Sequence, residues 1–253
     1  MSQTVSIVMP TKGRVELVRQ AIESVLAQTY AAFELLILDD SVKEDAMEII
    51  ELANSDSRIE YVDRNGIGVS EARARGVHRA RGSFITFLDS DDYWAKPRLE
   101  RHVDVWVNNE IGLSWDVCTE MGGPPTLAKQ PFSGGLIEAP RVARKLFLGN
   151  FIHASSGFTR TDLAREIDFS WSILSDWLLF MRLTESRAAF FIDETLSFRS
   201  VEPRDRVSNA YSDKFFFKES RDVRRGVLSA NPAVYVPAWV ERSWFRFRRK
   251  LRV

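Results

Sequence analysis

Short apolar runs alternate with amphipathic segments along the first 110 residues of the chain. Strands are predicted where the apolar runs are continuous, at residues 5–9, 33–38, 59–62 and 84–88. Helices are predicted between them, where apolar residues recur every three or four positions, at residues 15–28, 41–53 and 70–81. Strands that alternate with helices are typical of right-handed βαβ units. The pattern therefore predicts an α/β fold with a mostly parallel central sheet flanked by helices.

The second half of the chain has a weaker periodicity. It predicts helices at residues 97–109, 141–148 and 174–185 and a strand at 112–119. Loops are expected in the Gly- and Pro-rich stretch 122–135 and in the charged stretch 200–209. We expect one domain over residues 1–210, with halves 1–110 and 111–210, followed by a helical tail at 211–253.

The composition excludes several classes of protein. The 253 residues are 45% hydrophobic and 28% charged, which suits one large domain or a domain with a small appendage. A formal net charge of zero gives no global field to recruit nucleic acid. Cys118 is the only cysteine, so no disulfide can form within the chain. Neither a signal peptide nor a spanning apolar run is evident, and we expect a cytoplasmic protein.

Three carboxylates cluster on the turn that leaves the predicted strand at residues 84–88. They belong to Asp89, Asp91 and Asp92. Neighbouring like charges raise one another's pKa, so such a cluster does not serve stability. A divalent cation relieves the repulsion, and Mg²⁺ usually takes one or two carboxylates together with substrate phosphates. The turn therefore predicts Mn²⁺- or Mg²⁺-assisted handling of a nucleoside diphosphate.

Two other polar segments follow predicted strands. Pro10 and Thr11 end the first strand, and Asp39 and Asp40 follow the second. Ligands of open α/β sheets bind outside the carboxyl ends of the strands. We therefore expect these segments to meet the acidic turn at one edge of the sheet. Capping of the next helix is the alternative role for the two aspartates.

Taken together, four segments resemble the family 2 glycosyltransferases. They are residues 5–14, 33–41, 68–73 and 82–92, in this order, and a shorter match follows at 174–177. The resemblance implies the Rossmann-like GT-A fold and an inverting, nucleotide-sugar-dependent reaction. It also implies that residues 1–110 form the nucleotide-binding half and residues 111–210 the acceptor-side half.

The resemblance implies roles for residues of the first three segments. Pro10, Thr11 and Arg14 would lie along the nucleotide. Asp40 would accept a hydrogen bond from the imide of a uracil or thymine base. Arg73 would face the base or the diphosphate, although a solvated position on its helix is the alternative.

Further roles fall on the acidic turn and on the late match. Asp91 would bind the ribose hydroxyls, Asp92 would hold the metal with Asp91 beside it, and Asp89 would brace the loop. Asp176 would be the general base, with a helix cap as the alternative role. We expect Trp177 to serve packing rather than sugar stacking.

The chain departs from the family in the segment after its last core strand. Many relatives carry a histidine there, whereas residues 198–202 contain none. Arg199, Arg204 or Arg206 could contact the diphosphate instead. His153 has no metal-ligand spacing to the other histidines, but by resemblance its segment lies near the acceptor.

Aromatic and basic residues alternate near the C-terminus. The aromatic ones are Trp239, Trp244, Phe245 and Phe247, and the basic ones are Arg242, Arg246, Arg248, Arg249, Lys250 and Arg252. Such a segment suits the headgroup region of an anionic membrane, so we expect peripheral attachment to the inner face of the cell membrane. An amphipathic helix docked on the domain is the alternative.

The function expected from the sequence is sugar transfer. A UDP- or dTDP-sugar would donate to a hydroxyl of a glycan or lipid-linked acceptor, in bacterial cell-envelope or exopolysaccharide synthesis. One alternative is a sugar-phosphate nucleotidyltransferase, but residues 10–14 contain a single glycine where such enzymes have a Gly-rich loop. Another is a non-catalytic protein that binds nucleotide sugars on the same fold.

Overall fold

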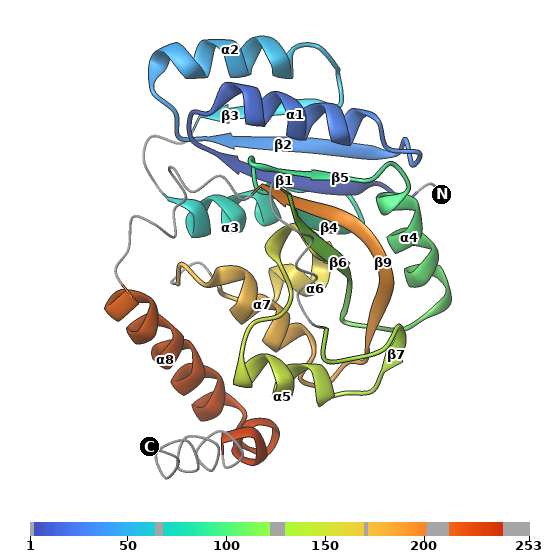
Figure 1. The fold of residues 1–253 in the computed structure, drawn as a ribbon, viewed down its shortest axis with the longest axis vertical. Helices are drawn as coiled ribbons and strands as arrows, with labels where there is room; N and C mark the ends of the chain where they lie inside the picture. Colours follow the sequence, from blue (N-terminus) through green and yellow to red (C-terminus); the bar gives the residue numbers. More distant parts are fainter. Residues whose placement is uncertain (1–2, 64–67, 122–129, 170–171, 201–212, 240–253) are drawn as a thin grey trace.

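The computed structural model describes residues 3–63, 68–121, 130–169, 172–200 and 213–239. Figure 1 shows a central sheet with helices packed around it. The strands are β1 (Val5–Thr11), β2 (Phe33–Asp39), β3 (Ile59–Asp63), β4 (Phe84–Phe87), β5 (Asp92–Trp94), β6 (Leu113–Met121), β7 (Gly135–Ile137), β8 (Gly157–Arg160) and β9 (Ala189–Ser200). The helices are α1 (Val15–Leu26), α2 (Lys43–Ala53), α3 (Val69–Arg79), α4 (Arg98–Asn108), α5 (Arg141–Leu148), the 3₁₀ turn η1 (Ala154–Ser156), α6 (Thr161–Arg165), α7 (Ser175–Leu183) and α8 (Asp213–Ala230).

All described strands belong to one sheet, which confirms the predicted α/β class. Its order is β3-β2-β1-β4-β8-β6-β9-β5, and β7 pairs with β9 outside this path. The four strands from β3 to β4 run parallel, as predicted. Beyond β4 the sheet is mixed, because β8, β5 and β7 pair antiparallel with their neighbours. Antiparallel strands need no helical crossover, which explains why the helix–strand alternation fades in the second half.

The first strands are apolar throughout because both faces of the sheet are covered there. Every residue of β1, β2 and β4 is buried. Figure 1 shows α1 and α2 on one side of these strands and α3 on the other. Such burial on two faces produces continuous apolar runs instead of alternation. It also leaves the carboxyl ends of the strands as the place where polar side chains can gather.

Helix α3 packs unusually close to β1. A Cβ atom added at Gly76 would lie 2.3 Å from Cγ1 of Val8, so a larger residue would push the helix away from the strand. Arg73 lies one turn earlier on the same helix and is itself buried. The close approach at Gly76 therefore holds Arg73 against the carboxyl ends of the central strands.

A fully buried polar network lies between α4 and the second half of the sheet. The Arg98 Nε atom donates to Oδ2 of Asp116 at 2.9 Å, and Nε2 of His102 lies 3.0 Å from the same oxygen. Burial and the neighbouring Arg98 charge lower the pKa of His102 to about 4, so its imidazole is neutral at neutral pH. The Arg98 guanidinium also stacks on Trp94 of β5, 4.1 Å from the ring centroid.

The tail is helical as far as the described residues extend. Helix α8 is followed by a second helical stretch at residues 232–239. The remaining basic and aromatic positions of the predicted membrane-binding segment lie outside the described residues. In the part of the chain that is described, no helix is both long enough and apolar enough to cross a bilayer.

Candidate active site

A pocket of about 400 Å³ opens at the carboxyl ends of β1 and β4. Residues from both halves of the chain and from α8 line it: Pro10, Arg14, Val69, Arg73, Asp89, Ser90, Asp91, Asp92, His153, Ala154, Ile173, Leu174, Asp176, Arg199 and Phe216. A larger hollow of about 810 Å³ lies at the opposite, amino end of β4. None of the predicted site residues is among the described residues that line this hollow. The chemistry is therefore concentrated in the smaller pocket.

The pocket brings together most of the side chains singled out in the sequence. Pro10, Arg14, Arg73, Asp91, Asp92 and Asp176 all line it. Thr11 and Asp40 lie at the same edge of the sheet, where the Asp40 N–H donates to the Thr11 carbonyl at 2.9 Å, but neither is among the described lining residues. The N-cap residue of α2 is Val42, without a side-chain hydrogen bond, so neither aspartate caps this helix. The Asp39 carboxylate instead accepts from the hydroxyl of Tyr61 at 2.9 Å and from Ser41.

Arg14 reaches the acidic turn from a strained backbone position. Its φ of 58° lies in the left-handed region, and no other described residue except glycines has a positive φ. Its guanidinium lies 2.8 Å from Oδ2 of Asp91 and 3.2 Å from the Ser90 hydroxyl. Strain of this kind persists where the surrounding contacts fix it, often at functional sites. Asp91 is thus held by a cation at the N-cap of α1.

Arg73 connects the acidic turn to α7. Its Nη2 atom lies 2.6 Å from Oδ1 of Asp89, and its Nη1 atom lies 3.2 Å from the Ser175 hydroxyl. The same Nη1 atom is 3.9 Å from Oδ1 of Asp176. Arg73 is only 5% exposed, so it is not the solvated helix residue that the alternative reading proposed.

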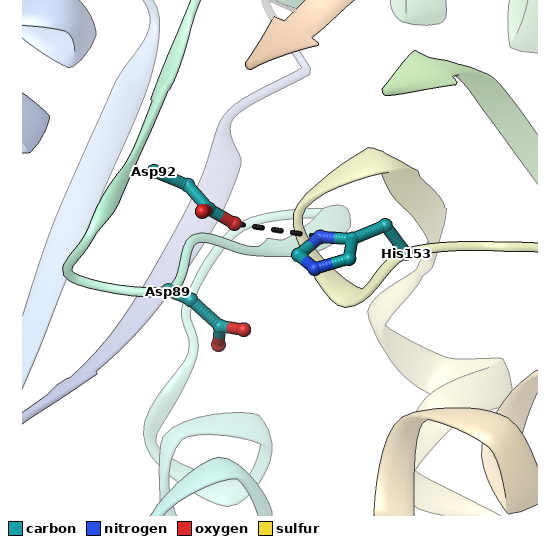
Figure 2. Close-up of side chains that lie close together, drawn as sticks. All are labelled: Asp89, Asp92 and His153. Carbon is teal, nitrogen blue, oxygen red and sulfur yellow. Dashed lines mark ion pairs between the residues drawn. The ribbon is translucent and has the colours of Figure 1, made fainter. Parts of the chain in front are cut away.

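Asp89, Asp92 and His153 converge in Figure 2, where the dashed line joins Asp92 to His153. One ligand atom from each lies within 4.8 Å of the other two, and Asp92 Oδ2 is 3.4 Å from His153 Nδ1. Asp91, expected to stand beside Asp92 at the metal, pairs with Arg14 and is not part of this group. Asp89 was expected only to brace the loop, and His153 was not expected among the ligands.

Ser155 joins the acidic turn to the segment that carries His153. Its hydroxyl donates to Oδ2 of Asp92 at 2.5 Å and accepts from the Asp89 N–H at 3.0 Å. Its carbonyl accepts from the Trp94 indole at 2.8 Å. One buried serine therefore fixes the turn, the first residue of β5 and the histidine segment relative to one another.

Asp176 lies in the first turn of α7, facing the pocket. The N-cap residue of this helix is Leu174, without a side-chain hydrogen bond, so Asp176 is not a cap. Trp177 beside it is buried and donates to the Leu146 carbonyl at 2.9 Å, which confirms its packing role. The carboxylate is thus free of a capping role and lies close to the acidic turn.

The family model for glycosyl transferase family 2 matches residues 6–167 of the chain, which is more than half of its length. The chain belongs to glycosyl transferase family 2.

Several curated glycosyltransferases are similar to part of the chain. An uncharacterized glycosyltransferase of Rickettsia felis is 41% identical over 110 residues, which cover 44% of this chain and 18% of the relative. The Escherichia coli protein named UDP-Glc:alpha-D-GlcNAc-diphosphoundecaprenol beta-1,3-glucosyltransferase WfgD is 37% identical over 113 residues, 44% of each chain. WcaA of Escherichia coli K12, a putative colanic acid biosynthesis glycosyl transferase, is 28% identical over 71% of this chain and 65% of its own. The chain thus spans less than half the length of the first of these curated relatives.

Solved structures confirm the GT-A fold of this family 2 chain. Staphylococcus aureus TarS, solved in complex with UDP-GlcNAc, superposes with a TM-score of 0.73 at 18% identity over 90% of this chain and 67% of its own. A mannosyltransferase of Pyrobaculum calidifontis, in complex with GDP-Man and Mn²⁺, gives a TM-score of 0.61 at 14% identity over 97% and 80% of the two chains.

The acidic side chains of the pocket repel one another, and a bound cation would relieve this repulsion. Burial and the charges of Asp89 and Asp91 raise the pKa of Asp92 well above its usual value. Burial acts most strongly on Asp89 and raises its pKa, but the charge and hydrogen bond of Arg73, together with His153 and Arg14, outweigh burial and lower the pKa. Burial lowers the pKa of His153, which favours the neutral imidazole. Two carboxylates and a neutral imidazole fit a divalent metal such as Mn²⁺.

Arg199 supplies a further cation from the end of β9. It lines the pocket and lies 3.4 Å from Oε1 of Glu120. It is one of the arginines expected to replace the missing family 2 histidine of this segment. The other two, Arg204 and Arg206, lie outside the described residues.

Proposed function

We propose that the chain is an inverting glycosyltransferase that moves a sugar from a UDP- or dTDP-sugar to a hydroxyl of a glycan or lipid-linked glycan. The observation that carries the proposal is the convergence of Asp176, Arg73 and the acidic turn in one pocket of about 400 Å³. A pocket of this size suits a small-molecule ligand. Asp40 and Thr11, at the same edge, are proposed to bind the base end of the nucleotide.

The residues divide the reaction between a leaving group and a nucleophile. The bond from the anomeric carbon to the diphosphate breaks, and both electrons leave with the nucleoside diphosphate. Arg14, Arg73 and Arg199 provide positive charge toward this leaving group. The acceptor oxygen attacks from the opposite side, which inverts the anomeric centre. Asp176 takes the proton of that hydroxyl, so a single carboxylate serves as general base.

A divalent cation is proposed to be held by Asp92 with Asp89 and His153. When bound, it would neutralise the negative charge that develops on the diphosphate. The raised pKa of Asp92 supports this assignment, because the repulsion among Asp89, Asp91 and Asp92 is what a cation would relieve. Asp91 is still proposed to bind the ribose hydroxyls. It would lie beside the metal without being one of its three proposed ligands.

The acceptor proposed is an envelope glycan or its lipid-linked precursor. Several relatives carry names in this area: WfgD is named for a diphosphoundecaprenol acceptor, WcaA for colanic acid and Bacillus subtilis TuaG for teichuronic acid. These names support bacterial envelope or exopolysaccharide synthesis as the setting. They leave the donor sugar and the linkage of this chain to be measured.

Thermal unfolding with nucleotides tests the donor proposal. UDP or dTDP should raise the melting temperature in the presence of Mn²⁺, and EDTA should remove most of that increase. The physical reason is mass action, since a ligand that binds only the folded state stabilises it. The Asp92→Asn variant should lose the metal-dependent part, whereas Asp162→Asn, in the hollow at the other end of β4, should retain it. If UDP, dTDP and GDP all leave the wild-type transition unmoved, the donor proposal is wrong.

Peripheral membrane attachment through the tail is proposed as well. Val236 and Trp239 lie three positions apart on the helical stretch 232–239 and are 46% and 50% exposed. Apolar and aromatic side chains of this kind enter the headgroup region, and the basic residues beyond them attract anionic lipid. Deletion of residues 239–253 should reduce sedimentation with phosphatidylglycerol vesicles. Neutral phosphatidylcholine vesicles serve as the control, and unchanged sedimentation of the truncated chain would contradict the proposal.

A further inference from the structure

Helix α8 contributes an aromatic side chain to the pocket. Phe216 is the fourth residue of this helix. Its side chain is half-buried and lines the pocket together with Asp176. The helix begins well beyond residue 167, where the match to the family model ends. Its neighbour Phe217 is 57% exposed and is not among the described lining residues. Phe216 and Phe217, the last two of three consecutive phenylalanines, therefore have different surroundings, and Phe216 faces the candidate site.

Several contacts fix α8 to the part of the chain that carries Asp176. The hydroxyl of Ser172, just before α7, donates to Oε2 of Glu219 at 2.9 Å. Arg224 donates to the Phe147 carbonyl at 2.7 Å, and its guanidinium lies 4.5 Å from the ring centroid of Trp177. Figure 1 shows α8 beside α7. The position of Phe216 relative to Asp176 is thus set by a packed helix pair.

The pocket is charged on one wall and apolar on the other. Arg14 and the acidic turn come from the carboxyl edge of the sheet, whereas Ile173, Leu174 and Phe216 come from the start of α7 and from α8. A diphosphate belongs on the charged wall. The acceptor must place a hydroxyl on Asp176, so the body of the acceptor lies against the side chains next to Asp176. Arg73 borders Asp176 on the charged side, 3.9 Å away, so the acceptor is left the side of the pocket lined by Ile173, Leu174 and the aromatic Phe216.

We infer that Phe216 is a sugar-stacking residue that binds the apolar face of a pyranose ring of the acceptor. This inference rests on the proposed glycosyltransferase function. A pyranose presents C–H groups on one face, and the negative face of an aromatic ring attracts such groups. The ring then leaves its hydroxyl edge directed at Asp176. Trp177 cannot do this, because it is buried in the α5–α7 packing.

The test compares four variants of the full chain: Phe216→Ala, Phe216→Leu, Phe216→Trp and, as a matched control, Phe217→Ala. The affinity for UDP is measured with Mn²⁺ by calorimetry, and transfer is measured with a panel of octyl glycosides as acceptors. Phe216→Ala should keep the UDP affinity and the melting temperature of the wild type and raise the acceptor KM about tenfold. Phe216→Trp should restore the KM, whereas Phe216→Leu, apolar but not aromatic, should not. Phe217→Ala should behave as the wild type.

Other results would contradict particular parts of the inference. Equal acceptor KM values for Phe216→Ala and Phe217→Ala would refute stacking, as would full recovery by leucine. If Phe216→Ala raises the KM for the nucleotide sugar but leaves the UDP affinity unchanged, the sugar ring that Phe216 binds belongs to the donor and not to the acceptor. Nucleotide binding by the wild type without transfer to any octyl glycoside would refute a ring-binding acceptor site. Absence of both nucleotide binding and transfer would instead refute the proposed function itself.

Discussion

Replacement of Asp176 by asparagine is expected to abolish sugar transfer while leaving nucleotide binding intact. Loss of a positioned general base typically lowers a rate by roughly 10²–10⁴-fold. The amide keeps the shape of the side chain but cannot take the acceptor proton. Arg73 retains its 2.6 Å contact with Asp89, so the fold and the charged side of the pocket should stay unchanged. The measurements are kcat for transfer and the UDP affinity in the presence of Mn²⁺.

The matched variant for this experiment is Asp176→Glu. It keeps a carboxylate on the first turn of α7 and should recover part of the lost rate. A variant at Asp162, which is exposed and paired with Arg160 away from the pocket, controls for loss of a negative charge. Transfer by Asp176→Asn at the wild-type rate would exclude Asp176 as the base. It would also indicate that another group takes the acceptor proton, or that the chain does not catalyse transfer.

Replacement of Asp116 by asparagine is expected to destabilise the fold strongly. Asp116 is fully buried and is the counter-charge of Arg98, which is also fully buried. Removal of one partner of such a pair leaves an uncompensated buried charge and costs roughly 3–5 kcal/mol. In a chain of this length that corresponds to a melting temperature lower by roughly 10 °C. Thermal and urea unfolding would measure the loss.

A second substitution separates charge from packing in this network. Asp116→Asn combined with Arg98→Met removes both charges and should recover part of the stability, because the buried cation is then gone. Asp104→Asn on the exposed side of α4 is the control and should stay within about 0.5 kcal/mol of the wild type. If Asp116→Asn unfolds at the wild-type temperature, the pair contributes little to folding.

The first half of the fold was predictable because its strands are buried on two faces. That burial produces the continuous apolar runs of β1, β2 and β4, and each predicted helix between them is present. Predictions in the second half were uneven. The helix at residues 141–148 is α5, but β8 and β9 were not predicted. β8 is four residues long and begins at a glycine, and β9 carries exposed polar residues in its middle, which breaks its periodicity.

Site residues could be predicted where they share one short sequence motif. They could not be predicted where folding brings distant residues together. Asp92 and Asp176 were predicted from their motifs, and both line the pocket. His153 is about sixty positions from its partners, so no local spacing could reveal it. The exchange of Asp89 for Asp91 in the cluster has a similar cause. Which carboxylate of a turn faces which neighbour depends on Arg14 and Ser155, and both contacts exist only in the folded chain.

β5 has a consequence for how the chain can be divided. The acidic turn ends in this strand, which pairs antiparallel with β9 at Asp92 and Arg199, although β9 comes roughly a hundred positions later. A fragment ending near residue 110 would contain every carboxylate of the turn and still lack the strand that holds it. The arrangement of these carboxylates therefore depends on pairing between two segments far apart in the sequence. An exchange of fragments between relatives at that boundary would separate β5 from β9, so we expect residues 1–110 not to behave as an independent module.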